Sequence, residues 1–173
     1  MVEIPKHAFE YETVRRLGDM LRTTKEDYET TESYALFATI VCWVMQRART
    51  RDDENGPNNV QAREVGIALQ GVRISDEPWE VKRFPEMSAF DFFVEVRNAV
   101  AHGDARNITP LNEGNVLTGQ SIRIKGESLL LRRADMQRLG GELAKLFCDT
   151  MAQYEEEGDL RARAAKIERE EPG

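Results

Sequence analysis

Three polar side chains close an otherwise apolar stretch of the chain, and their types suit phosphate chemistry. Arg97, Asn98 and His102 lie in FDFFVEVRNAVAHGD, residues 90–104. The guanidinium of Arg97 stays charged and can hold a phosphate through two parallel hydrogen bonds. The imidazole of His102 can titrate near neutral pH. Asn98 precedes His102 by one helical turn, so the two side chains are expected to share a face.

These residue types match the demands of RNA cleavage without a metal. RNA carries its own nucleophile, the 2′-hydroxyl, so a protein has to supply a base, an acid and positive charge on the phosphorane. We assign the positive charge to Arg97, proton transfer to His102 and orientation of the imidazole to Asn98. The reaction has two proton transfers and therefore needs two proton-transfer groups. The other histidine, His7, lies in a predicted leader and is not expected to supply the second. The hypothesis therefore predicts a two-fold dimer in which both copies of Arg97 and His102 share one cleft.

A purely structural interpretation of the same residues stays open. Arg97 would then form an ion pair, and Asn98 would satisfy backbone groups. His102 would sit at the C-terminal end of a helix, where the helix dipole favours a cation.

The element that must position these residues is predicted to be a buried helix. Ser88 is a suitable N-cap, with Asp91 three residues later. Gly103 is placed to end the helix, since glycine tolerates the left-handed C′ conformation. The segment also has the apolar stripes of a buried helix, formed by Phe90, Phe93, Val94, Val96 and Val100.

The rest of the chain predicts further helices around this one. Helical periodicity extends over residues 9–22, 30–49, 60–70 and 134–154. The second of these contains ALFATIVCWVM, which is apolar all round and is expected to be the central helix. Gly140 and Gly141, inside the last long helix, can allow close packing against another helix.

A small β-hairpin is predicted before the last helix. Residues 121–125 and 128–131 alternate or run apolar around Gly126-Glu127. Residues 104–120 are rich in Gly, Asn and Pro and are predicted to be a loop. The expected fold class is all-α, a helical bundle of four or five helices with this hairpin as an appendage.

Length and composition predict a single globular domain. The chain has 173 residues and a net charge of −7. We expect a leader over residues 1–8, a helical domain over 9–154 and a charged tail over 155–173, which is either a solvated, fraying helix or a segment that binds a partner. An acidic protein is a poor general nucleic-acid coat, so RNA contact would need a local basic site. Candidates, otherwise expected to be simply solvated, are Arg123, Lys125, Arg132 and Arg133.

Several other classes of protein are disfavoured. The chain lacks a P-loop, a dinucleotide fingerprint and a nucleophile elbow, and we expect no cofactor. Cys42 and Cys148 are expected to be reduced and to act as small buried hydrophobes, and with only two histidines a zinc site is not expected. The acidic run 52–54 lacks the ligand spacing of a calcium loop. No signal peptide is evident and the most apolar run, 34–45, is too short to span a membrane, so a cytoplasmic location is expected.

The segment RNAVAHG, with Arg97, Asn98 and His102, resembles the signature of the HEPN superfamily (higher eukaryotes and prokaryotes nucleotide-binding domains). That signature is an Arg, usually followed by a polar residue, and a His after a gap of about four to six residues. Here the gap is four, the motif closes an apolar helix and it ends in His-Gly. The resemblance covers about residues 9–154, with the motif as its one specific part.

The resemblance implies a helical, often dimeric, metal-independent endoribonuclease. Such proteins are similar to toxins of toxin–antitoxin and abortive-infection systems and to anti-phage effectors. The partners that the resemblance implies are RNA, a second copy of the chain and an antitoxin or regulatory protein. Some toxin members carry a modifiable Tyr two residues after the His, where this chain has Asp104. Other members of the family bind proteins or nucleotides without cutting RNA, so a non-catalytic interaction or nucleotide-binding module is the alternative.

Overall fold

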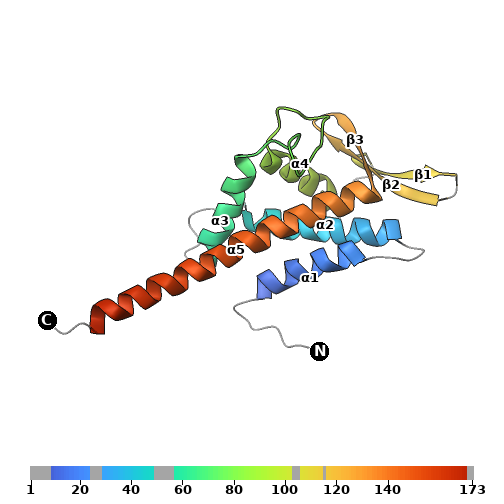
Figure 1. Cartoon of the computed structure of the whole chain (residues 1–173). Coiled ribbons are helices and arrows are strands. Elements are labelled where there is room, and N and C mark those ends of the chain that lie inside the picture. Colours follow the sequence, from blue (N-terminus) through green and yellow to red (C-terminus); the bar gives the residue numbers. More distant parts are fainter. Residues whose placement is uncertain (1–8, 24–28, 49–56, 103–105, 115, 171–173) are drawn as a thin grey trace.

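A computed structural model describes residues 9–23, 29–48, 57–102, 106–114 and 116–170. Within these ranges the chain forms helices and one small sheet (Figure 1). The elements are α1 (Phe9–Thr23), α2 (Glu29–Ala48), α3 (Pro57–Gln70), α4 (Ala89–His102), β1 (Ile108–Glu113), β2 (Val116–Ile124), β3 (Glu127–Arg132) and α5 (Arg133–Glu170). The four predicted helical periodicities and the predicted motif helix are thus all confirmed as helices.

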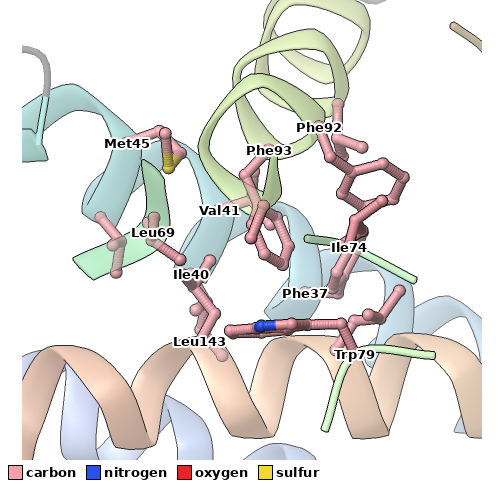
Figure 2. Close-up of a cluster of buried hydrophobic side chains, with 14 of the residues drawn as sticks. Phe37, Ile40, Val41, Met45, Leu69, Ile74, Trp79, Phe92, Phe93 and Leu143 are labelled. Carbon is pink, nitrogen blue, oxygen red and sulfur yellow. The ribbon is translucent and has the colours of Figure 1, made fainter. Parts of the chain in front are cut away.

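Helix α2 lies at the centre of the helical layer, as its apolar middle predicts. It contacts α1, α3, α4, α5 and the sheet. Its side chains at Phe37, Ile40 and Val41 are fully buried. Figure 2 shows them beside Phe92 and Phe93 of α4, with Leu143 of α5 below. The buried residues of α2 pack against several neighbouring elements at once, and this packing ties the motif helix to the rest of the fold.

Helix α5 runs along α1 and α2 and continues past the other helices (Figure 1). Its close approach depends on glycine at position 140. A Cβ built there would lie 2.7 Å from Leu21 Cδ2 and 3.1 Å from Phe37 Cδ2. The prediction that the glycine pair allows close packing is therefore confirmed for Gly140. Helix α5 continues to Glu170, so the charged tail, expected to be a solvated, fraying helix, is helical and continuous with the predicted helix over 134–154.

Helix α4 begins as the sequence predicts. The Ser88 hydroxyl oxygen accepts a hydrogen bond from the backbone N–H of Asp91 at 3.0 Å, which is the N-cap interaction. Phe92, Phe93 and Val96 are fully buried. The proposed stop at Gly103 and the neighbouring Asp104 lie outside the described residues, as do the leader, His7 and the acidic run 52–54.

The sheet corrects the expectation of an all-α fold. It has three antiparallel strands in the order β1-β2-β3, so most of the region predicted to be loop over 104–120 is strand. The prediction was wrong because proline, asparagine and glycine there were interpreted as turn residues. Pro110 is tolerated in β1 because that strand lies at the sheet edge. Gly119 is required in β2 because a Cβ there would lie 2.3 Å from the Leu131 carbonyl oxygen.

The predicted hairpin is confirmed as the pairing of β2 with β3. Ile124 pairs with Glu127 across a two-residue turn. The turn residues are Lys125 and Gly126, one position earlier than expected, and both have positive φ, 48° and 85°. Positive φ at both central positions is the type I′ geometry that matches the twist of a hairpin. This turn brings a lysine close to the end of α4.

Candidate functional site

The three motif residues lie in the last two turns of α4, between α2 on one side and β2 on the other. Arg97 and His102 are five residues apart, which on an α-helix separates their directions by about 140°. Asn98 and His102 are about 40° apart. The motif helix therefore presents the guanidinium and the imidazole to different neighbours.

His102 and Asn98 line a hollow between α4 and the β2–β3 hairpin, here named the hairpin hollow. It has a volume of about 260 Å³, and its lining includes Glu95, Asn98, His102, Arg123, Lys125 and Gly126. The His102 side chain is exposed. The hollow therefore combines an accessible imidazole with two cations from the hairpin, partly offset by one carboxylate.

The hairpin holds Arg123 in place at this hollow. Its backbone N–H donates to the Asn107 carbonyl at 2.8 Å, and its Nε donates to the Gly126 carbonyl at 3.3 Å. The sequence had left Arg123 and Lys125 between RNA contact and simple solvation. The structure places them beside His102, whereas Arg132 lies in an ion pair with Glu113 at 2.6 Å and Arg133 in one with Glu29.

Arg97 lines a different hollow, between α2 and α4, here named the α2–α4 hollow. Its volume is about 630 Å³, and its apolar wall is formed by Ala38, Cys42, Trp43, Val100 and Ala101. Gln46, Arg47 and Arg97 provide its polar groups together with Thr39. One protomer thus does not place Arg97 and His102 in the same hollow.

The Arg97 guanidinium is held by neutral oxygens. Its Nη2 donates to Gln46 Oε1 at 2.9 Å, and its Nη1 donates to Asn98 Oδ1 at 3.4 Å. Within the described ranges Arg97 makes no ion pair. The structural interpretation, in which Arg97 serves only to form an ion pair, is therefore not supported by the described residues. Gln46 was missed by sequence reasoning because nothing in the pattern of α2 indicates which residue faces α4.

Asn98 accepts a hydrogen bond from Arg97. Across the described part of the chain, no hydrogen bond joins the Asn98 amide to the imidazole. The two side chains do share the hairpin hollow. Orientation of His102 by Asn98 therefore stays a prediction.

Neither cysteine forms a disulfide, and burial raises the pKa of both thiols. For Cys42, which lines the α2–α4 hollow, burial raises the pKa while the positive charge of Arg97 acts in the opposite direction. For Cys148, burial and then the Asp149 carboxylate raise the pKa to about 11. Both thiols are thus protonated at neutral pH.

Two further absences apply to the described residues alone. Among them, no group of three or more His, Cys, Asp and Glu side chains is arranged to hold a metal ion. None of their helices is long and apolar enough to cross a membrane.

Comparison with family models, with curated proteins and with solved structures found no match to this chain.

Proposed function

We propose that this chain is a metal-independent endoribonuclease of the HEPN type, acting in the cytoplasm as a dimer and serving as a toxin or anti-phage effector. The observation that carries the proposal is the hairpin hollow. It holds an exposed imidazole at the end of α4 together with Asn98, Arg123 and Lys125. Cleavage of a phosphodiester needs cations that bind the phosphate and a group that transfers protons, and residues of both types line this open hollow.

The proposed reaction is attack of the RNA 2′-hydroxyl on the adjacent phosphorus. A base takes the hydroxyl proton as the new oxygen–phosphorus bond forms, and an acid gives a proton to the 5′ oxygen as its bond to phosphorus breaks. The products are a cyclic phosphate and a free 5′-hydroxyl. His102 from each of two chains would supply the base and the acid, and Arg97 would stabilise the charge on the phosphorane.

The geometry of α4 supports the need for two chains. Arg97 and His102 of one protomer line separate hollows. A two-fold axis near the C-terminal end of α4 would bring Arg97 of one copy toward His102 of the other. The local cations at Arg123 and Lys125 would hold the RNA backbone despite the net charge of −7.

The test is cleavage of single-stranded RNA in the presence of a chelator. We expect His102→Ala to lower the rate by about 100-fold or more, as is typical when a proton-transfer group is removed. Arg97→Ala is expected to lower it by about 100-fold, as for loss of a charge-stabilising donor. The matched control is Arg73→Ala, an exposed arginine whose carboxylate contact, with Glu86 at 3.5 Å, lies away from both hollows.

Sedimentation of the same samples measures the oligomeric state. The proposal predicts a dimer for the wild type and for both site variants. RNA left intact by a folded wild-type dimer would contradict the nuclease and favour a non-catalytic interaction module.

A second function, binding an antitoxin or regulatory protein, is favoured by the course of α5. This helix continues to Glu170, past the helices that pack against its first half (Figure 1). A chain truncated after residue 154 should keep its unfolding midpoint and lose such a partner. Binding of a candidate antitoxin by the full chain alone would support this role, and equal binding by both chains would refute it.

A further inference from the structure

The α2–α4 hollow has the size and lining of a small-molecule site. Its volume of about 630 Å³ lies within the range of about 300–1,000 Å³ that is common for ligand sites. Its wall is largely apolar, with the indole of Trp43 and the Cys42 thiol on α2 facing Val100 on α4. The Thr39 hydroxyl already donates to the Ala35 carbonyl at 2.7 Å, so its proton is committed within the helix.

At the polar side of this hollow lies a guanidinium whose charge no carboxylate of the described residues neutralises. Arg97 is partly buried and bonds to the uncharged amide oxygens of Gln46 and Asn98. An arginine has five N–H donors, so these two contacts leave others for a ligand. No described carboxylate lies within ion-pair distance of it. A partly desolvated cation beside an apolar wall favours an anion as its next partner.

The charge of Arg97 also acts inside the hollow. It opposes the effect of burial on the pKa of the Cys42 thiol, which lies in the same wall. The positive potential of the guanidinium therefore reaches the space that a ligand would fill.

We infer that the α2–α4 hollow binds a small amphipathic anion, an apolar body carrying one oxyanion group such as a carboxylate. The apolar body would pack against Trp43, Cys42 and Val100. The oxyanion would accept hydrogen bonds from Arg97. A single anionic group fits better than a polyphosphate because most of the wall is apolar.

This inference is independent of the proposed ribonuclease activity and would hold for a chain that cuts no RNA. If the chain does cut RNA, the bound anion occupies Arg97 and competes with the phosphodiester for it.

A pair of fluorescent probes tests the chemistry of the site. Anilinonaphthalene sulfonate has an apolar ring system with one oxyanion, and phenylnaphthylamine has the same rings without the charge. We expect one sulfonate probe per protomer. Arg97→Met should weaken its binding by about tenfold or more, as for loss of a charged hydrogen bond, and should leave binding of the neutral probe unchanged. Arg73→Met is the control for removal of an arginine elsewhere on the surface.

A steric variant and a thiol reaction locate the probe. Ala101→Phe adds bulk at an exposed position in the wall and should abolish binding of both probes, whereas Ala134→Phe, at an exposed position in the first turn of α5, should not. Alkylation of Cys42 by iodoacetamide, followed by mass spectrometry, should slow by about tenfold at ten times the probe Kd, by mass action. Alkylation of Cys148 should not change.

The outcomes separate cleanly. Sulfonate binding that is insensitive to Arg97→Met, or an alkylation rate at Cys42 that the probe leaves unchanged, would overturn the inference. If circular dichroism shows that Arg97→Met is unfolded, Arg97→Lys replaces it; sulfonate binding should then be weakened, because an ammonium does not reproduce the paired donors of a guanidinium, but retained because the charge remains, and complete loss would refute a charge-based site.

Discussion

Two adjacent glycines in α5 should respond in opposite directions to the same substitution. At Gly140 a new Cβ would lie 2.7 Å from Leu21 Cδ2 and 3.1 Å from Phe37 Cδ2, and both of those side chains are fully buried. At Gly141 the nearest atom to a new Cβ is Arg22 Nη1 at 3.9 Å, an ordinary contact. Gly140→Ala therefore forces the packed core to move, and Gly141→Ala does not.

The magnitudes follow from helix propensity and overpacking. Replacing glycine by alanine inside a helix stabilises it by about 1 kcal/mol. Gly141→Ala should gain most of this amount. Overpacking a buried contact costs about 1–3 kcal/mol, so Gly140→Ala should be destabilised by about 1 kcal/mol after the propensity gain. The two variants should differ in free energy of unfolding by about 2 kcal/mol.

Urea unfolding followed by circular dichroism measures this difference. The expected result is a higher midpoint than wild type for Gly141→Ala and a lower midpoint for Gly140→Ala. Equal stabilisation of both variants would show that α5 does not approach α1 and α2 as closely as the structure has it.

Three further predictions concern the elements around the site. Ser88→Ala should lower the free energy of unfolding by about 1 kcal/mol because it removes the N-cap of α4, measured by urea unfolding against Ser128→Ala, an exposed position in β3. Gly126→Ala should cost about 1 kcal/mol because alanine is strained at a φ of 85°, and a midpoint unchanged from wild type would contradict the turn geometry. For Cys148, the pKa is about 11 in the folded chain against 9.0 ordinarily, so its thiol ionises first in the unfolded chain. Stability should therefore fall as the pH rises from about 9 to about 11 in wild type relative to Cys148→Ala, and identical pH profiles would argue against burial of that thiol.

The helices could be predicted because their patterns are long and local. The buried centre of α2 and the cap at Ser88 need no knowledge of distant partners, and both are confirmed. The charged segment after residue 154 has no apolar stripe, so it was expected only to be a solvated, fraying helix or a partner-binding segment, and its continuity with α5 as far as Glu170 could not be predicted. Charge alone does not indicate where a helix ends.

The first strand of the sheet could not be predicted because two of its residues, Pro110 and Asn112, are poor strand formers. Pro110 and Asn112 are acceptable in β1 only because of its position at an edge, and Gly119 in β2 only because β3 passes so close. The edge position of β1 and the close approach of β3 are both features of the tertiary structure. A local pattern of turn residues favours a loop until the neighbouring strand is known.

In the candidate site, the motif residues could be identified from the sequence, but the residues that surround them in the structure could not. The exposure of His102 at the end of α4 agrees with its position before a glycine. The pairing of Arg97 with Gln46 depends on the crossing of α2 and α4. The approach of Lys125 depends on the hairpin turn. These are long-range contacts, and no spacing within α4 encodes them.

The terminus left on a single-stranded RNA incubated with the purified chain in chelator tests the central claim most directly. We expect fragments that end in a cyclic phosphate to be formed by wild type and to be absent with His102→Ala. Intact RNA, or fragments without a cyclic phosphate that persist in the His102→Ala variant, would contradict it.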